Sequence, residues 1–242
     1  MAGIETAMVL AAGRGTRMRP LTDNMPKPLV PLAGRPLLGH VLDRLAAAGI
    51  ARAVVNVHHF ADQIEAYLAD CHEPAIEVSC ARGAILETGG GVLNALPRLG
   101  SAPFMVHNSD SVWTEGPRSN LGRMMDAWAP RDMDALLLLA KRDTSIGFDG
   151  LGDYYMDAPG RLQRRSGSEE APYVFAGVSI LKPQLFEGVT EQVFSLVRMF
   201  DRANARNALF GVVLEGTWMH VGTPEALTEA ENHLNEGKRR RA

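Results

Sequence analysis

Runs of apolar residues with the length of buried β-strands recur along the chain. They are rich in Val, Ile, Leu and Phe, residue types that favour the packed, pleated surface of a sheet. The predicted strands cover Ala7–Ala12, Ala53–His58, Ile76–Ala81, Phe104–Asn108, Ala135–Ala140, Val174–Leu181 and Leu209–Leu214.

Two stretches between the first strands carry apolar residues at helical spacing instead. The first has Leu37, Leu38, Val41, Leu42 and Leu45, and the second has Ile64, Tyr67 and Leu68. Strands that alternate with helices in this way favour a mainly parallel sheet with helices on both faces. The pattern therefore predicts an α/β fold.

The second half of the chain is less regular. Between residues 143 and 172 the pattern gives way to Gly, Asp, Arg and Ser around an isolated Tyr154-Tyr155-Met156, which predicts an inserted hairpin and loop. Segments of this kind often contact substrates. Further on, helical spacing returns at Val193, Leu196, Val197 and Phe200, and again from Pro224 through Leu234. We find no internal repeat or linker, so we expect one domain over residues 1–242.

Composition and charge indicate which classes of molecule the protein binds. The chain has 242 residues, 46% of them hydrophobic, which suits a sizeable core. Its 25 Lys and Arg are balanced by 28 Asp and Glu, a net charge of -3. No global charge therefore favours nucleic acid or an anionic membrane, and we expect small-molecule substrates. The basic run at residues 238–242 is interpreted as a solvated tail.

Cysteine usage and the N-terminal pattern bear on location. Cys71 and Cys80 form no CxxC pair and allow at most one disulfide, which fits a reducing compartment. The apolar run Ala7–Ala12 is too short for a signal peptide or a membrane span. We therefore expect a cytoplasmic protein, and the sequence leaves its oligomeric state open.

A glycine-rich loop follows the first predicted strand. It reads Leu10-Ala11-Ala12-Gly13-Arg14-Gly15-Thr16-Arg17 and lies where α/β sheets bind ligands, at a strand's carboxyl end. Glycines let backbone N–H groups approach phosphate oxygens, and a guanidinium bridges two of them. A dinucleotide fingerprint would need a third glycine at Met18, and Gly-Lys-Ser/Thr of a P-loop is absent. Taken alone, the loop is equally well explained as a tight turn.

Ten residues after Arg17, a single lysine stands between two prolines in Pro26-Lys27-Pro28. The prolines keep the backbone extended, which aims the Lys27 ammonium at the same phosphates. The alternative is an ordinary solvated lysine. We predict that Arg17 and Lys27 are the catalytic cations, which stabilise the charge that builds as a phosphoanhydride bond breaks.

Together these residues resemble the signature of sugar-1-phosphate nucleotidyltransferases, L-A-A-G-x-G-T-R-M-x-P-L-T-x-x-x-P-K-P-L. Further motifs follow in the family's order: Leu86-Glu87-Thr88-Gly89-Gly90-Gly91, Asn108-Ser109-Asp110, Gly152-Asp153 and Trp218-Met219-His220-Val221-Gly222-Thr223. The branch that the chain most resembles is that of bacterial N-acetylmuramate α-1-phosphate uridylyltransferases, which act in peptidoglycan recycling. The resemblance implies the nucleotide-diphospho-sugar transferase fold, a Rossmann-like three-layer sandwich.

The resemblance also implies roles for individual residues. Arg17 and Lys27 would bind the triphosphate, Asn108 and Asp153 would face the sugar, and residues 143–172 would form a sugar-binding insertion. The residues implied to surround the nucleotide are Leu10, Ala11, Ala12, Gly13, Gly15, Thr16, Glu87 and Gly90.

A metal site is implied at Asp110, which matches the aspartate that holds Mg²⁺ in this family. Its alternative role is to cap a turn. His220 stands where the family has a second metal-binding aspartate, and an imidazole there would make Mn²⁺ an alternative to Mg²⁺. Alternatively, His220 packs beside Trp218 or binds phosphate. His58 and His59 are interpreted as ordinary loop or core residues, since they lack a third metal-ligand partner.

Three consecutive glycines at residues 89–91 have two explanations. Thr88 would N-cap a helix in which the glycines are merely tolerated, or the glycines would lie close to a ligand. Each glycine weakens a helix by roughly 1 kcal/mol relative to alanine. We therefore attribute them to closeness to a ligand.

The sequence thus predicts an enzyme that couples UTP to N-acetylmuramate 1-phosphate and releases pyrophosphate with the help of Mg²⁺. One alternative is a guanylyl- or uridylyltransferase for mannose or glucose 1-phosphate. Another is a sugar-nucleotide sensor without catalysis, a reading favoured by the departure from the family at His220.

Overall fold

The computed structural model describes residues 3–80 and 85–239. Its helices are α1 (Leu37–Ala47), α2 (Ala61–Ala69), α3 (Glu87–Leu99), α4 (Asn120–Ala127), α5 (Val197–Asn204) and α6 (Pro224–Arg239). The strands of its large sheet are β1 (Thr6–Leu10), β4 (Arg52–Val57), β5 (Ala75–Cys80), β6 (Phe104–Asn108), β8 (Ala135–Lys141), β9 (Tyr154–Met156), β10 (Leu162–Arg164), β11 (Tyr173–Leu181) and β12 (Leu209–Val213). Two ribbons pair β2 (Pro31–Leu32) with β3 (Arg35–Pro36) and β7 (Ser111–Trp113) with β13 (Trp218–His220). Short 3₁₀ turns are η1 (Thr16–Met18), η2 (Lys27–Leu29), η3 (Arg142–Thr144) and η4 (Pro183–Phe186).

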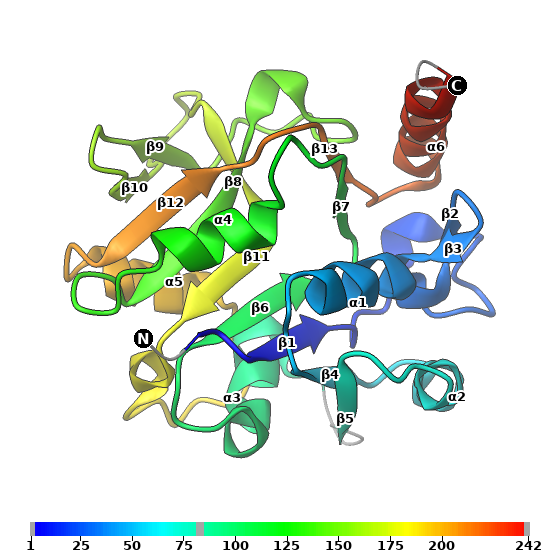
Figure 1. The fold of residues 1–242 in the computed structure, drawn as a ribbon, viewed down its shortest axis with the longest axis horizontal. Helices are drawn as coiled ribbons and strands as arrows, with labels where there is room; N and C mark the ends of the chain where they lie inside the picture. The colour runs from blue at the N-terminus through cyan, green and yellow to red at the C-terminus, as the bar shows by residue number, and fades with distance from the viewer. Residues whose placement is uncertain (1–2, 81–84, 240–242) are drawn as a thin grey trace.

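The large sheet is mostly parallel where the site lies (Figure 1). Its strand order is β10-β9-β11-β6-β1-β4-β5, with β8 beside β11 and β12 beside β8. Strand β1 runs parallel to β4 and β6, and β4 runs parallel to β5, whereas β11 runs antiparallel to β6 and β8. The predicted α/β architecture is confirmed.

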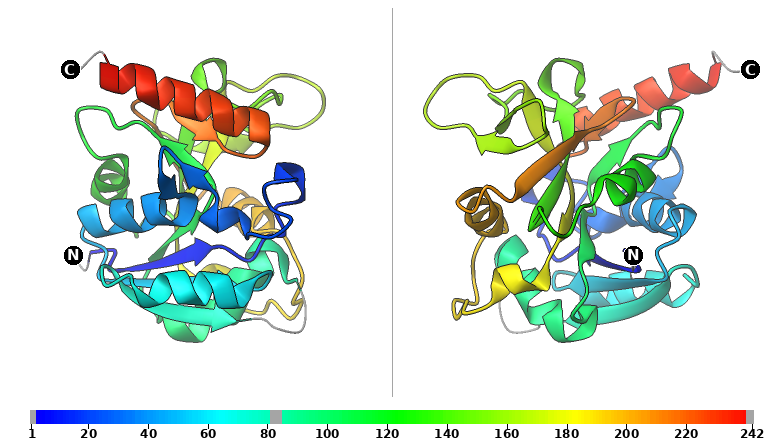
Figure 2. Two further views of the ribbon diagram at one scale, coloured as in Figure 1. Left: turned by 90° about the vertical axis from the view of Figure 1, so that its right-hand side faces the viewer. Right: turned by 60° about the vertical axis from the view of Figure 1, so that its left-hand side comes forward.

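Helices cover both faces of the sheet, which makes three layers (Figure 2). Along β1, Ala7 and Val9 pack in the core beneath α1, α2 and α4, while Met8 packs in the core beneath α3 and α5. This alternation is what the period of two in a strand requires when both faces are buried. A smaller core joins α6 to the ribbons through Leu32, Met219 and Val221. Over the described ranges, no helix has both the length and the apolarity needed to cross a membrane.

Most predicted elements agree with the structure to within two residues. All seven predicted strands are present, although Ala81, the end of one of them, lies outside the described residues. The hairpin predicted within residues 143–172 is confirmed as β9 and β10, which pair antiparallel. The periodicity identifies these strands because both sheet faces are buried.

Two predictions near the C-terminus are wrong. The helix predicted to include Val193 begins only at Val197, and Val193 is 46% exposed. The preceding residues instead cross the start of α3, where the carbonyl of Phe194 accepts hydrogen bonds from the N–H groups of Gly89 and Gly90. The last helix continues to Arg239 rather than ending at Leu234, so the predicted tail is partly helical. Residues 240–242 of that tail lie outside the described residues.

The glycines at 89–91 lie inside α3, and protein atoms explain the first two. A Cβ on Gly90 would lie 1.9 Å from the carbonyl oxygen of Gln192, and one on Gly89 would lie 2.4 Å from the ring of Phe194. These distances are far below van der Waals contact. Contacts within the chain are therefore sufficient to explain the glycines at 89 and 90, without a ligand.

Candidate active site

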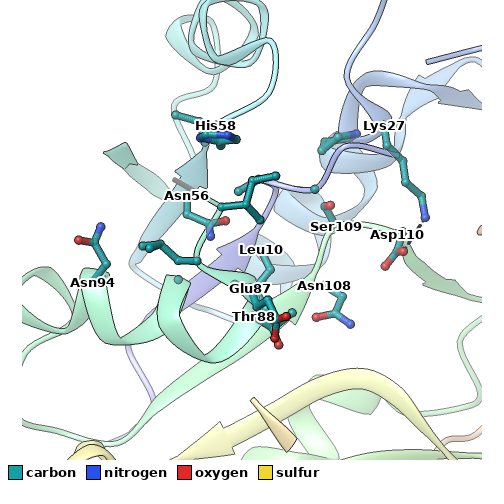
Figure 3. Close-up of a pocket in the computed structure, with 17 residues that line it drawn as sticks. Leu10, Lys27, Asn56, His58, Glu87, Thr88, Asn94, Asn108, Ser109 and Asp110 are labelled. Carbon is teal, nitrogen blue, oxygen red and sulfur yellow. Dashed lines mark hydrogen bonds and ion pairs between the residues drawn. The ribbon is translucent and has the colours of Figure 1, made fainter. Parts of the chain in front are cut away.

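A cavity of about 220 Å³ opens at the carboxyl ends of β1, β4 and β6 (Figure 3). The three strands are parallel neighbours, so their ends meet at one edge of the sheet. The cavity is lined by Leu10, Ala12, Gly13, Lys27, Pro28, Asn56, Val57, His58, Ile85, Leu86, Glu87, Thr88, Gly91, Asn94, Asn108, Ser109 and Asp110. The apolar wall and amide side chains suit a flat heterocycle with polar edges.

The predicted nucleotide residues divide around this cavity. Leu10, Ala12, Gly13 and Glu87 line it, while Ala11, Gly15, Thr16 and Gly90 lie outside its lining. Ala11 is buried, and its N–H donates to Oδ1 of Asn56 at 2.7 Å.

Gly15 has a structural reason to be glycine. Its φ of 64° is left-handed, and a Cβ there would lie 2.8 Å from Cβ of Lys27. The glycine-rich loop therefore passes directly against the lysine that follows it in the signature.

Lys27 and Asp110 form the central ion pair of the site. The Lys27 Nζ lies 2.6 Å from Oδ2 of Asp110, and the two side chains are 11% and 23% exposed. Burial raises the pKa of Asp110, but the charge and hydrogen bond of Lys27 and the nearby His220 outweigh it and hold the pKa below its usual value. Asp110 is therefore a carboxylate at neutral pH.

Arg17 and His220 lie close to this pair and line a second cavity. A Cβ on Gly222 would be 2.8 Å from Nε2 of His220 and 3.7 Å from Nη1 of Arg17, so both side chains border this glycine. Burial lowers the pKa of His220, the charges of Lys27 and Arg17 lower it further, and Asp110 opposes them. His220 also packs 5.6 Å from the ring of Trp218. The structure thus brings the four predicted residues Arg17, Lys27, Asp110 and His220 to one place.

The ribbon of β7 and β13 is what joins Asp110 to His220. Ser111, the residue after Asp110, pairs with His220, and Trp113 pairs with Trp218. Sequence analysis missed this ribbon because three-residue strands are too short to show a period.

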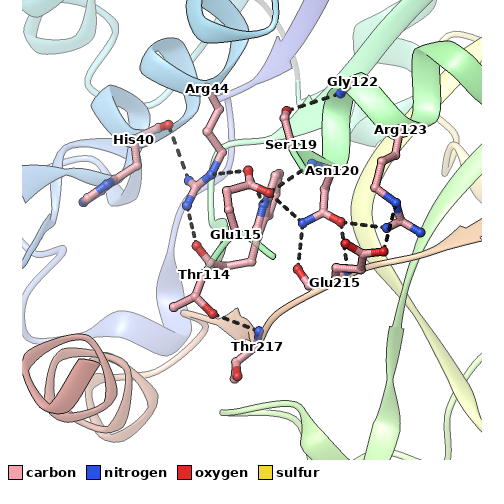
Figure 4. Close-up of polar contacts among 11 residues, drawn as sticks. His40, Arg44, Thr114, Glu115, Ser119, Asn120, Gly122, Arg123, Glu215 and Thr217 are labelled. Atoms are coloured by element: carbon pink, nitrogen blue, oxygen red, sulfur yellow. Dashed lines mark hydrogen bonds and ion pairs between the residues drawn. The ribbon is translucent and has the colours of Figure 1, made fainter. Parts of the chain in front are cut away.

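The far end of the ribbon is closed by a buried asparagine (Figure 4). The Nδ2 of Asn120 donates to Oε2 of Glu115 at 2.7 Å and to the carbonyl of Glu215 at 2.8 Å, and its Oδ1 accepts from the N–H of Glu215 at 2.8 Å. Glu115 in turn accepts from the indole Nε1 of Trp113 at 2.8 Å. Asn120 therefore ties the segment after β7 to the segment before β13.

The predicted sugar residues lie on either side of an irregularity in β11. Asn108 lines the cavity, while Oδ2 of Asp153 accepts from the N–H of Phe175 at 2.8 Å. The register of β11 against β8 shifts between Phe175 and Ser179. Within that bulge, a Cβ on Gly177 would lie 3.2 Å from Cβ of Asn108. The bulge therefore connects the two predicted residues.

Several cavity residues were missed by sequence analysis. His58, interpreted as ordinary, lines the cavity, as do Asn56, Asn94 and Ser109. Asn56 carried a usable signal, because a polar side chain inside the buried run Ala53–His58 needs a reason to be there. Its burial, with 7% exposed, and its bond to the glycine-rich loop supply that reason.

Comparisons with known proteins identify the family of the chain. Residues 7–148 match the family model described as MobA-like NTP transferase domain. The chain is 46% identical over 234 residues to the N-acetylmuramate alpha-1-phosphate uridylyltransferase of Caulobacter vibrioides, covering 95% of this chain and 97% of that protein. It is 36% identical to the protein of the same name from Neisseria meningitidis, covering 93% and 96%. A crystal structure of UDP-glucose pyrophosphorylase complexed with UDP-glucose shares the fold, with a TM-score of 0.79, 16% identity, and coverage of 97% and 99%.

Proposed function

Because this chain belongs to the MobA-like NTP transferase family of sugar-1-phosphate nucleotidyltransferases, we propose that it couples UTP to N-acetylmuramate 1-phosphate and releases pyrophosphate. The observation that carries the proposal is the ion pair of Lys27 and Asp110 at a cavity formed by parallel strand ends, with the charge of Arg17 close by at His220. Relatives named for the same reaction cover nearly the whole chain and support the choice of both substrates.

The reaction needs alignment and charge more than acid–base chemistry. An oxygen of the sugar phosphate attacks the α-phosphorus in line, a new P–O bond forms, and the α–β bond breaks to release pyrophosphate. The attacking phosphate is already ionised at neutral pH, so it needs no general base. Arg17 and Lys27 reduce the repulsion between the two anions and stabilise the charge that moves onto pyrophosphate.

The remaining residues divide between the two substrates in this proposal. Leu10, Ala12, Gly13 and Glu87 contact the base and ribose, and Ala11, Gly15, Thr16 and Gly90 support the backbone around them. Asn108 and Asp153 face the sugar, and the hairpin region 143–172 lies on that side of the site. Localised positive charge at Arg17 and Lys27 selects phosphates over neutral ligands.

A divalent cation fits this donor set in part. Asp110 is an ionised oxygen donor and His220 a nearby imidazole, while no group of three His, Cys, Asp or Glu side chains suited to a metal occurs in residues 3–80 and 85–239. Asp110 and His220 would hold the ion, and phosphates and water would complete its shell. When bound, Mg²⁺ or Mn²⁺ would neutralise phosphate charge and orient the α-phosphate.

The test is a matrix of four nucleoside triphosphates against N-acetylmuramate, N-acetylglucosamine, glucose and mannose 1-phosphates, with pyrophosphate as the readout. We expect the highest kcat/KM for UTP with N-acetylmuramate 1-phosphate. A higher kcat/KM for GTP with mannose 1-phosphate would favour the activity for which more distant relatives, at 26–29% identity, are named. Nucleotide binding without any pyrophosphate release would contradict an enzyme and favour a sensor.

A further inference from the structure

Ser111 is the residue between the central carboxylate and the ribbon that leads to His220. It directly follows Asp110, begins β7 and pairs with His220 across the ribbon. Only 2% of its surface is exposed, so its hydroxyl is shielded from solvent. A buried hydroxyl must find its hydrogen-bond partners within the protein.

The Ser111 hydroxyl bonds to two different elements. Its Oγ accepts from the indole Nε1 of Trp218 at 2.9 Å, and it donates to the carbonyl oxygen of Ala176. Trp218 belongs to β13 and Ala176 to β11. One hydroxyl therefore holds three strands that meet at the site.

The partner in β11 lies in the bulge that connects the proposed sugar residues. Ala176 sits between Phe175, whose N–H donates to Asp153, and Gly177, whose φ is 80°. A Cβ on Gly177 would lie 2.9 Å from Cβ of Ser111 and 3.2 Å from that of Asn108. Ser111 therefore packs directly against the bulge of β11 and is also the chain neighbour of Asp110.

We propose that Ser111 is a positioning residue that fixes Asp110 and His220 relative to the bulge of β11. The proposal rests on the proposed function, since it assigns these groups to one reaction. Removing Oγ leaves the Trp218 N–H and the Ala176 carbonyl without their shared partner. The strands then need to shift to find other partners, and a displacement of about 1 Å in an aligned site costs up to about 100-fold in rate.

The chain offers a matched control in Ser179. It is also a fully buried serine, it lies in β11, and its Oγ has no hydrogen-bond partner in the described part of the structure. Ser111→Ala and Ser179→Ala thus delete the same atom from similar depth. The two variants differ because the Oγ of Ser111 bonds to two other strands of the site, whereas the Oγ of Ser179 has no hydrogen-bond partner in the described residues.

The first experiment measures kcat, KM for each substrate and melting temperature for both variants. It also measures Mn²⁺ binding in the complex with UTP, without sugar phosphate, by the electron paramagnetic resonance signal of free Mn²⁺. For Ser111→Ala we expect kcat to fall about 10- to 100-fold, KM for UTP to stay within about twofold, and the Kd of Mn²⁺ to rise at least about fivefold. Ser179→Ala should match wild type in each.

Trp218→Phe provides a second variant, because it removes the indole N–H that donates to the Oγ of Ser111. The double variant with Ser111→Ala should be little worse in kcat than Ser111→Ala alone, since both act on one interaction. A lower melting temperature for Ser111→Ala with unchanged kcat and Mn²⁺ affinity would overturn the positioning role.

The two proposals fail in different ways. If wild type binds Mn²⁺ with UTP but releases no pyrophosphate with any sugar phosphate, the proposed function is wrong, and the Mn²⁺ affinities still decide the role of Ser111. A wild-type protein that neither turns over nor binds Mn²⁺ with UTP would overturn both.

Discussion

At the scale of single residues, the pair of Lys27 and Asp110 sets the electrostatics of the site. The two charges are 2.6 Å apart and mostly shielded from water, where attraction between ions is strong. Without substrate, each charge satisfies the other. When phosphates bind, the ammonium has an additional anionic partner, so the same lysine serves the resting protein and the reaction.

We predict that Lys27→Ala and Arg17→Ala each lower kcat/KM by at least about 100-fold, because each removes a cation from the developing pyrophosphate. The measurement is steady-state pyrophosphate release, with melting followed by circular dichroism. The control is Lys182→Ala, which breaks a comparable ion pair, 2.9 Å from Asp134, distant in sequence from the signature. Near-normal turnover in Lys27→Ala or Arg17→Ala would remove that residue from the site.

His220 makes a separate prediction about metal preference. A neutral imidazole contributes nitrogen and no charge, so His220→Asp should favour Mg²⁺ over Mn²⁺ more strongly than wild type, and His220→Ala should bind both ions weakly. Titration of each ion into the UTP complex measures this. The close packing on Trp218 gives the competing view that His220 only fills space. The same ratio of Mg²⁺ to Mn²⁺ affinity in wild type and in both variants would support that view.

At the scale of elements, the ribbon of β7 and β13 depends on contacts made by side chains. It has three residue pairs and lies outside the large sheet. Its ends are held by Ser111 near Asp110 and by Asn120 at the far end. Asn120 is fully buried and replaces a missing strand neighbour by bonding both backbone groups of Glu215.

Replacing Asn120 with leucine should lower the free energy of unfolding by about 2–5 kcal/mol, because it leaves the backbone N–H and carbonyl of Glu215 without partners and removes one donor from the carboxylate of Glu115. Urea unfolding followed by circular dichroism measures the change. Arg118→Ala serves as the control, since its ion pair with Asp126 is about two-thirds exposed on both sides and should contribute less than about 1 kcal/mol. Equal stability of Asn120→Leu and wild type would show that the ribbon does not need the hydrogen bonds of the Asn120 side chain.

The glycines of α3 and α4 provide an opposed pair of predictions. Gly90→Ala places a Cβ 1.9 Å from a backbone carbonyl and should cost about 1–3 kcal/mol, whereas a Cβ on Gly122 meets nothing closer than 3.7 Å. Gly122→Ala should therefore stabilise α4 by about 0.5–1 kcal/mol. Urea unfolding measures the stability of both variants. A Gly90→Ala variant more stable than wild type would mean that the segment at Gln192 moves aside at little cost.

At the scale of the whole molecule, the sequence predicts the layers better than it predicts the contacts between them. Strands buried on both faces and amphipathic helices leave periodic patterns, so the seven strands and the order of layers could be recognised. The clash of Gly90 with Gln192 could not, because the two residues are about a hundred positions apart and meet only in the fold. The same holds for the site. Sequence motifs predicted Arg17, Lys27 and Asp110, whereas the contacts of Ser111 and Asn120 arise only in the folded chain.

Buried histidines make the stability of the whole fold sensitive to acid. Burial lowers the pKa of His107 to about 4, despite its hydrogen bond to the carbonyl of Asn108, and it also lowers the pKa of His40 and His220. His107 is fully buried, and its ring stacks 5.4 Å from that of Trp113. Each of these side chains is therefore neutral in the folded protein at a pH where the unfolded chain already carries a proton.

The sign of the effect follows from this difference in bound protons. Below about pH 6.5 His107 binds a proton in the unfolded state, whereas in the folded state it stays neutral until about pH 4. The free energy of unfolding therefore falls as the pH falls from about 6.5 to about 4. At about pH 4, His107 accounts for a loss of about 3 kcal/mol in the free energy of unfolding. His107→Phe keeps the ring against Trp113 and cannot titrate, so its stability should fall less steeply from pH 6.5 to 4. Urea unfolding at several pH values measures the slopes, with Ser179→Ala as a buried control variant whose slope should match that of wild type. Parallel slopes for wild type and His107→Phe would mean that His107 takes up its proton within the fold, and the acid sensitivity would then belong to His40 and His220.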